Sequence, residues 1–487
     1  MQRLHAFILT THRILGSLLS ILFAIWFLSG LVMIYHSFPR VNKTDKWSKM
    51  ENLKDFGNLP AWEEIQASIP ADERIKRITL NENLGQLVFY IQTDKGNYER
   101  TADFSERTTV NATHIRQTAS KWNQSPIERI DTLYTLEQWI PFGALKQHFP
   151  IYKYYFADQG KHQLYVSSKT AEVLQYTNRE ERCWAWLGAI PHWIYFTSLR
   201  QDIDRWIAVV VTLSGIGSLF CLTGLYLGIR DIRLARRQQR LSPYKKWWYK
   251  WHHLAGAFFG VFVLTFSFSG MMSLVRVEDL GIRSRLDFNP HQFLNEMKVD
   301  SYLLDYRKVM QACPHPIRQF EWSQFGSIPL YQTQTDNGII TWDARQADSV
   351  KVLNLTATDV RQVLQDIHGE QSQIEIQWLT EQETYYTSRK KPLPLPVWKV
   401  QIKDSDASCY YIDPVHGTYR YVNRPARWQH WMYPAWHSLQ IPGLVTRPWF
   451  WFLLMWFLML GGTFVSISGC WLTIKYIRRK IKSKLHK

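Results

Sequence analysis

Four of the 16 histidines lie at positions where they could bind a metal cofactor in pairs. His12 and His252 each stand at the start of an apolar run, and His192 and His437 each stand in an aromatic segment that precedes another such run. Neutral imidazole is a common ligand of haem iron, and two imidazoles on one iron give a six-coordinate haem suited to electron transfer. We therefore predict two haem b groups, one held by His12 with His252 and one by His192 with His437.

Other ligands and metals stay open at this point. His253 and His430 are near neighbours in sequence of two of the predicted ligands, and His36 lies 24 residues beyond His12, which corresponds to about 36 Å along a helix. These three histidines are alternative ligands. A metal other than haem iron is less favoured, because the apolar runs contain no HExxH motif and no carboxylate-rich cluster. Three arginines are candidates to bind the haem propionates: Arg13, Arg200 and Arg427.

The five cysteines limit the cofactor type. Because the sequence contains no CxxCH motif, covalent attachment of a c-type haem is excluded, and the absence of CxxC argues against a thioredoxin-like redox pair. Three cysteines lie in the long segments between apolar runs and allow at most one disulfide, whose pairing the sequence does not assign: Cys183, Cys313 and Cys409.

Four uncharged apolar runs must position these histidines, at residues 14–34, 206–229, 254–274 and 449–474. Each run reaches the roughly 20 residues that a helix needs to cross the hydrocarbon core of a bilayer. The sequence therefore predicts four transmembrane helices and a lipid bilayer as partner, although the mean hydropathy of the whole chain is only -0.26.

The net charge of +17 is concentrated in three short segments, 1–13, 230–250 and 475–487, which together hold 17 basic residues and one acidic residue. An excess of Lys and Arg beside transmembrane ends marks the cytoplasmic side, so the charge predicts topology and argues against nucleic-acid binding. The segments 35–205 and 275–448 are then extracytoplasmic, which in a bacterium with an inner membrane means periplasmic. Each is long enough to bury a core of its own.

The chain also matches itself in two registers, which predicts a tandem duplication of span, outer domain and span. The matched positions pair His12 to Gly16 with His252 to Gly256, Ser29-Gly30 with Ser269-Gly270, Tyr165 with Tyr410, Tyr176 with Tyr421, His192 with His437, and Gly224 with Gly469. Alternating runs such as 86–91 and 163–166 indicate strands, and 59–65 indicates a helix start. We expect two α+β outer domains.

These motifs resemble the PepSY-associated transmembrane family. The resemblance rests on the repeated start at His12 and His252, a Tyr-Ile-Asp-Pro-x-x-Gly hairpin from Tyr411 to Gly417, and a span that ends Thr-Gly-Leu-Tyr-Leu from Thr223. The first half departs from it, because residues 167–171 lack the Asp-Pro and Gly of the hairpin. The resemblance implies PepSY-like outer domains, an iron-regulated inner-membrane protein, and, as in some members, a di-haem reductase of ferric siderophores. It also implies that His12, His192, His252 and His437 are the haem ligands.

Two functions follow as hypotheses. The first is a haem-dependent oxidoreductase that reduces ferric iron in a siderophore or another chelate; its electrons must come from quinol or a partner reductase, because the chain has no GxGxxG and no P-loop. The alternative is a non-enzymatic membrane protein whose outer domains bind or restrain a partner such as a protease. Transport through the helices is less favoured, because the spans contain no Asp, Glu, Lys or Arg to mark a pathway.

Overall fold

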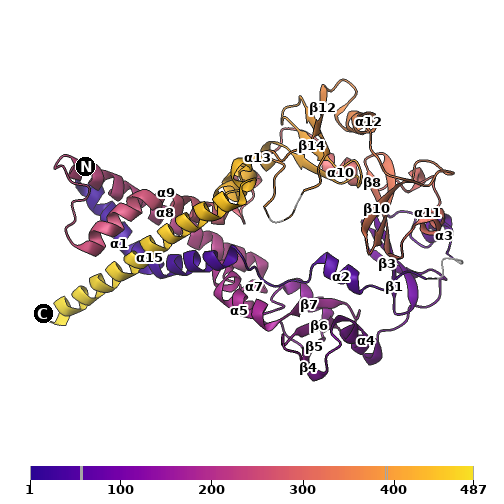
Figure 1. Cartoon of the computed structure of the whole chain (residues 1–487), viewed down its shortest axis with the longest axis horizontal. Helices are drawn as coiled ribbons and strands as arrows, with labels where there is room; N and C mark the ends of the chain where they lie inside the picture. Colours follow the sequence, from indigo (N-terminus) through magenta and orange to yellow (C-terminus); the bar gives the residue numbers. More distant parts are fainter. Residues whose placement is uncertain (1, 55–58, 390, 392, 486–487) are drawn as a thin grey trace.

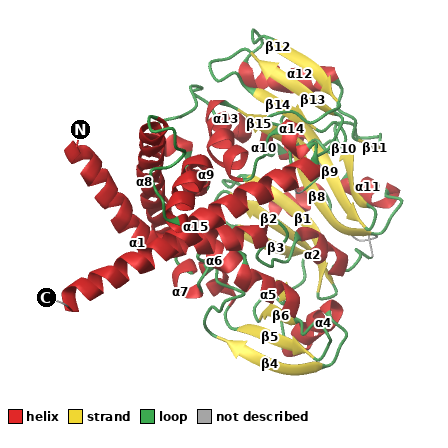
Figure 2. Ribbon diagram, turned by 60° about the vertical axis from the view of Figure 1, so that its left-hand side comes forward, coloured by secondary structure: helices red, strands yellow, loops and turns green. Residues whose placement is uncertain are grey.

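The computed structural model describes residues 2–54, 59–389, 391 and 393–485. Residue 1 and residues 486–487, the extreme ends of the predicted terminal segments, lie outside this range. Figure 1 shows a bundle of long helices at one end of the molecule and a sheet-containing region at the other. Figure 2 shows the same division, with the strands gathered on one side of the long helices.

Four helices form the bundle: α1 (Gln2–Met33), α8 (Ile203–Arg236), α9 (Trp247–Met272) and α15 (Pro448–Leu485). All four are long and apolar enough to cross a membrane, which confirms the predicted spans. Helices α8, α9 and α15 continue past the predicted runs into the basic flanking segments, because Lys and Arg are good helix formers. Large apolar side chains such as Phe23, Phe27, Phe266 and Met455 fill the bundle core.

Both termini lie at the same end of the bundle, and both sheet-containing segments emerge from the opposite end (Figure 1). We name these ends the terminal side and the sheet side. Helices α1 and α9 run from the terminal side to the sheet side, and α8 and α15 return, as the predicted topology requires. The chain is therefore a multi-pass membrane protein with its folded domains on one side of the bundle.

A seven-stranded antiparallel sheet joins the two outer segments. Its strand order is β11-β10-β9-β8-β1-β2-β3. The bounds are β1 (Ile75–Asn83), β2 (Gln86–Thr93), β3 (Asn97–Thr101), β8 (Ile317–Phe325), β9 (Ile328–Thr335), β10 (Gly338–Asp343) and β11 (Lys351–Val352). The junction pairs Ile78 with Trp322 and Leu80 with Phe320, and all four side chains are buried. They pack against α3 (Trp62–Ala67) and α11 (Tyr306–Ala312).

Each outer segment also holds a four-stranded sheet of its own. The first contains β4 (Ile127–Leu133), β5 (Ile151–Phe156), β6 (Gln163–Ser167) and β7 (Val173–Thr177), and the second β12 (Ile374–Leu379), β13 (Val397–Ile402), β14 (Cys409–Ile412) and β15 (Tyr419–Val422). One face of the first sheet packs on α4 (Ala112–Trp122), and one face of the second on α12 (Ala357–His368). The predicted strands and the 411–417 hairpin are present, and β6 and β7 form a hairpin without Asp-Pro-Gly.

The other faces of these two sheets point towards the bundle. Tyr165 of the first sheet packs with Ala185 of α5 (Arg179–Leu187) and Ile190 of α6 (Ala189–Trp193). Tyr411 of the second packs near Ala426 of α13 (Arg424–His430). Each four-stranded sheet therefore supports the helical segment that leads into a returning span. The outer segments remain α+β, as expected, but they share the seven-stranded sheet, which pairs edges that two separate domains would leave exposed.

Candidate haem-binding site

The four predicted histidines lie in two pairs, one toward each end of the bundle. His12 is on α1 and His252 is on α9, and both rings face a returning helix on the terminal side. His192 is on α6, and His437 follows the π-helix Trp431–Ala435; both rings face a first-pass helix on the sheet side. The terminal-side pair therefore sits on the long helices themselves, and the sheet-side pair on the segments that lead into them.

Each of the four rings contacts a hydroxyl group of a neighbouring helix through Nδ1. The distances between Nδ1 and the hydroxyl oxygen are 3.1 Å for His12 with Thr223, 2.8 Å for His252 with Ser468, 3.2 Å for His192 with Ser29, and 3.1 Å for His437 with Ser269. Among the described residues, no hydrogen bond is formed by Nε2 of these rings. The same atom of each ring is therefore held by the same chemical group.

The hydrogen bonds of the hydroxyl groups determine which ring nitrogen carries the proton. Each hydroxyl donates its own hydrogen to a backbone carbonyl three or four residues earlier on its helix: Thr223 to Phe220 (2.6 Å), Ser468 to Val465 (2.9 Å), Ser29 to Ile25 (2.6 Å) and Ser269 to Phe266 (3.3 Å). The hydroxyl oxygen is then left to accept, so Nδ1 must donate. Nε2 of a neutral ring keeps its lone pair, which is the state that binds a metal ion.

His192 gives an independent check on this assignment. Its Nδ1 also lies 3.0 Å from the backbone carbonyl oxygen of Trp26. A carbonyl oxygen can only accept, so Nδ1 carries the hydrogen. Histidines that bind metals almost always donate the hydrogen of the second nitrogen to such an acceptor, because this fixes the ring orientation and the tautomer.

A glycine follows each of the four hydroxyl residues and lets the ring approach the helix. A Cβ atom added at Gly224 would lie 2.8 Å from Cε1 of His12, and one at Gly30 would lie 3.4 Å from Cε1 of His192. The corresponding distances are 3.5 Å at Gly270 for His437 and 3.6 Å at Gly469 for His252. The contact is tight for His12 and His192 and ordinary for the other two. A Ser-Gly or Thr-Gly dipeptide thus forms one wall at each histidine.

The two sheet-side rings lie near one another. The ring centroids of His192 and His437 are 6.2 Å apart, with the ring planes inclined by 60°. Two imidazoles on opposite sides of one metal ion, with metal–nitrogen bonds of about 2 Å, place their centroids about 6 Å apart. His12 and His252 lie on α1 and α9, and each faces a returning helix toward the terminal side. The donor atoms and tautomers of all four residues, and the spacing of the sheet-side pair, therefore fit bis-imidazole haem.

The surroundings keep the sheet-side rings neutral. Burial, together with the nearby His437, lowers the pKa of His192 to about 4, and burial also lowers the pKa of His437. Both imidazoles are therefore unprotonated at neutral pH and available to a metal ion.

The three alternative ligands have different surroundings. The ring of His36 stacks on that of Trp184 with centroids 4.4 Å apart. His253 contacts the carbonyl oxygen of Gly228 through Nε2 (3.2 Å), the atom that the four main candidates leave open. His430 packs edge-on against Tyr385. Within the described part of the chain, none of the three has the contact between Nδ1 and a hydroxyl group, so the structure favours the original four.

Two further sets of residues brace the sheet-side pair. The indole nitrogens of Trp206 and Trp451, at the start of the returning spans, donate to the backbone carbonyls of Trp193 (2.8 Å) and Ser438 (2.9 Å). These carbonyls belong to the residues that directly follow His192 and His437. Behind each segment lies a partly buried network in which a glutamate accepts from a lysine and a tyrosine: Glu137 with Lys153 and Tyr165, and Glu383 with Lys399 and Tyr411.

Sequence reasoning identified the histidines but gave no role to the hydroxyl residues. The repeated Ser29-Gly30 and Ser269-Gly270 were visible in the sequence, and Thr223-Gly224 and Ser468-Gly469 complete the pattern.

Two of the arginines predicted to bind haem propionates have other contacts in the structure. Arg427 donates to the carbonyls of Asp406 and Ala407, and Arg200 packs among aromatic rings. All five cysteines are free. Among the described residues there is no cluster of three or more His, Cys, Asp or Glu for another metal.

Comparison with known proteins identifies the family. A family model described as the PepSY-associated TM region matches residues 12–475, nearly the whole chain. The chain therefore belongs to the PepSY-associated transmembrane family, as its sequence motifs led us to expect. No curated protein matches it.

Proposed function

We propose that this protein is a di-haem b oxidoreductase that passes electrons from the terminal side to the sheet side of the membrane and there reduces ferric iron in a chelate such as a ferric siderophore. The observation that carries the proposal is the environment repeated at four histidines, in which a hydroxyl group contacts Nδ1, a glycine faces the ring and no described residue bonds to Nε2. Packing at a helix end requires no such uniform choice of tautomer.

The residues of the chain have distinct tasks in this proposal. His12 and His252 would hold one haem, and His192 and His437 the other; when bound, haem iron supplies reversible one-electron chemistry. The Ser and Thr hydroxyls orient the rings and keep the hydrogen on Nδ1. A haem held by two of these histidines would have no open site for oxygen, which suits electron transfer.

The substrate would be an Fe(III) chelate on the sheet side. It accepts one electron to give Fe(II), which is less highly charged and softer and is therefore held more weakly by hard oxygen ligands. The electron comes from an external quinol or reductase, because the chain has no nucleotide-binding motif of its own. The charge distribution favours a bacterial inner membrane with both termini in the cytoplasm and the sheets in the periplasm.

The test uses the full-length protein, expressed with adequate haem supply and reconstituted in sealed vesicles. We expect b-type bands that dithionite reduces, and two haems per chain. With a quinol donor and a ferric hydroxamate presented to the sheet side, an Fe(II)-specific chelator should report reduction in the wild type and a large loss of reduction in His12→Ala and His437→Ala. A colourless protein would refute the proposal and leave the alternative, a membrane protein that binds a partner without catalysis.

A further inference from the structure

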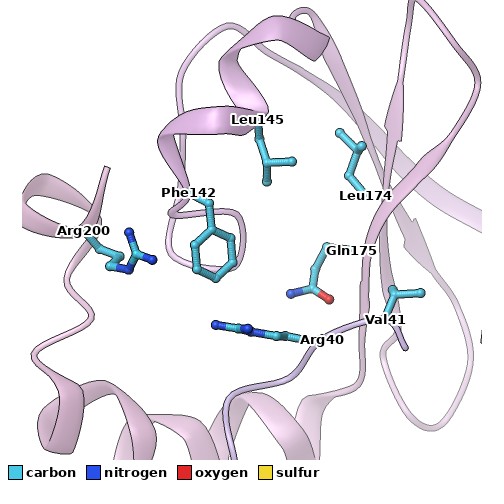
Figure 3. Close-up of a pocket in the computed structure, with 7 residues that line it drawn as sticks. All are labelled: Arg40, Val41, Phe142, Leu145, Leu174, Gln175 and Arg200. Atoms are coloured by element: carbon cyan, nitrogen blue, oxygen red, sulfur yellow. The ribbon is translucent and has the colours of Figure 1, made fainter. Parts of the chain in front are cut away.

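A cavity of about 280 Å³ opens on the sheet side where the first outer domain meets the bundle. Figure 3 shows its polar part, formed by two arginines and a glutamine, facing an apolar part. The lining residues are Arg40, Val41, Phe142, Leu145, Leu174, Gln175 and Arg200. The lining contains two positive charges and no carboxylate, and none of the four histidines belongs to it.

Aromatic rings hold Arg200 in a fixed position. Its guanidinium carbon lies 5.0 Å from the ring centroid of Phe142, 5.2 Å from that of Tyr195 and 4.7 Å from that of Trp206. Its Nε atom is buried and has no hydrogen-bond partner in the described part of the chain. Within the described residues, no acceptor takes a hydrogen from any nitrogen of this guanidinium, so its donors are left for a ligand.

Arg40 approaches the same ring. Its guanidinium carbon is also 5.0 Å from the centroid of Phe142, so the two charged groups are no more than twice that distance apart. The backbone beside Arg40 is held by Gln175, whose side-chain amide donates to the carbonyl of Pro39 (2.8 Å). Within the described residues, neither arginine forms an ion pair. Two like charges are thus placed together with no negative group between them.

The position of the cavity indicates the source of a negative group. Arg200 lies three residues before the start of α8, and Arg40 lies seven residues after the end of α1, so both lie close in sequence to the sheet-side ends of two spans. Arg40 and Arg200 do not belong to the cluster of Lys and Arg that marks the terminal side, because these two arginines lie on the sheet side. Apolar Leu145 and Leu174 line the rest of the cavity.

We propose that this cavity binds a phosphate group between Arg40 and Arg200, supplied by the headgroup of an anionic phospholipid. Guanidinium groups form charge-assisted, often bidentate, hydrogen bonds with phosphate oxygens. The apolar residues would contact the glycerol and upper acyl carbons. The bound lipid would also steady Trp206, which packs on Arg200 and holds the segment that carries His192.

The experiment uses delipidated full-length protein in detergent, with native mass spectrometry to count bound phosphatidylglycerol during a titration. We expect one tightly bound lipid per chain. Arg200→Gln should weaken this binding roughly tenfold, and the double variant Arg40→Gln with Arg200→Gln roughly a hundredfold, because each arginine contributes a charge-assisted contact. Arg205→Gln is the matched control: this arginine lies at the same end of α8 but pairs with Asp202 (3.2 Å), so lipid binding should not change.

A parallel titration with inorganic phosphate separates the two possible sources. Lipid binding that depends on both arginines supports the proposal. Phosphate binding with the same dependence, but without lipid binding, would support a phosphate site and overturn its lipid source. Equal lipid binding in the wild type and the double variant, or no binding of either probe, would overturn the site itself. Arg40→Gln alone, at an exposed position, provides the same test without disturbing the aromatic packing of Arg200.

Discussion

The terminal-side and sheet-side histidine pairs make the same type of contact, but the segments that carry the histidine and the hydroxyl group are exchanged. His12 and His252 sit on the first-pass helices and face hydroxyl groups of the returning helices, whereas His192 and His437 precede the returning helices and face hydroxyl groups of the first-pass helices. The terminal-side pair therefore depends on the bundle alone. The sheet-side pair also depends on the outer domains, through Trp206, Trp451 and the glutamate networks.

This difference indicates where each site is rigid and where it can be adjusted. Long helices packed side by side fix His12 and His252, because moving either ring would require a shift of a whole span. His192 and His437 lie on short helical segments whose positions follow the four-stranded sheets behind them. We therefore expect changes in the outer domains to act on the sheet-side site and to leave the terminal-side site unchanged.

The largest effect is expected from the histidines themselves. His437→Ala removes one of the two proposed ligands on the sheet side, and His12→Ala removes one on the terminal side, so each variant should retain about one haem instead of two. Haem extraction and protein quantification give the ratio. His36→Ala serves as the control, since that ring stacks on Trp184 and should leave both haems in place. Full haem content in either of the first two variants would remove that residue from the ligand set.

Loss of a hydroxyl group should weaken one site by a smaller amount. Ser269→Ala and Ser468→Ala each remove the group that accepts from Nδ1, and changes of this kind typically lower affinity 10- to 100-fold. Haem titration of the apoprotein should show weaker binding at the sheet-side site for Ser269→Ala and at the terminal-side site for Ser468→Ala. Ser273→Ala is the control, because within the described residues that hydroxyl donates only to the Gly270 carbonyl. Unchanged affinities would show that the hydroxyls do not support the ligands.

The sheet-side pair should also make the haem-free protein sensitive to acid. Burial holds the pKa of His192 at about 4, whereas the unfolded chain takes up this proton near pH 6.5. Between these values the unfolded state binds more protons, so stability should fall as the pH falls from about 6.5 to 4, by roughly 3 kcal/mol at most. Thermal unfolding of the apoprotein followed by circular dichroism measures this slope. An equally steep slope in His192→Gln would contradict the assignment.

The smallest effect should come from the braces of the outer domains. Trp451→Phe keeps an aromatic side chain but removes the N–H group that donates to the Ser438 carbonyl, and the lost hydrogen bond is worth about 1 kcal/mol. In a His12→Ala background, where only the sheet-side haem remains, haem affinity should fall several-fold. In a His437→Ala background it should not change. Trp449→Phe, at a side chain that is 66% exposed, controls for loss of an indole.

Much of the fold could be predicted because the signals were local. Uncharged runs of about 20 residues define spans whatever lies around them, and clustered Lys and Arg indicate which loops share a side. The pairing of β1 with β8 could not be predicted, because it joins residues about 240 positions apart and leaves no pattern within either strand. The tandem duplication stays a prediction, which the repeated Ser-Gly and Thr-Gly walls support.

The alignment of the two halves from sequence is wrong by one residue in one strand. The sequence aligned Tyr165 with Tyr410, but the contacts of Tyr165 match those of Tyr411, since both tyrosines donate to a glutamate that also binds a lysine. Tyr410 points to the other face of its sheet, toward α12. A shift of one residue moves every side chain of a strand to the opposite face. The pairing of β6 with β7 is irregular between Tyr165 and Val166, and this irregularity accounts for the shift of one residue. The sequence alone does not reveal it.

The pairing of the four histidines is tested most directly by the haem content of two double variants. His192→Ala with His437→Ala removes both ligands of one proposed haem, so about one haem per chain should remain. His192→Ala with His252→Ala removes one ligand from each, so almost none should remain. Equal haem content in the two double variants, or more haem in the second than in the first, would contradict the pairing across the two halves of the chain.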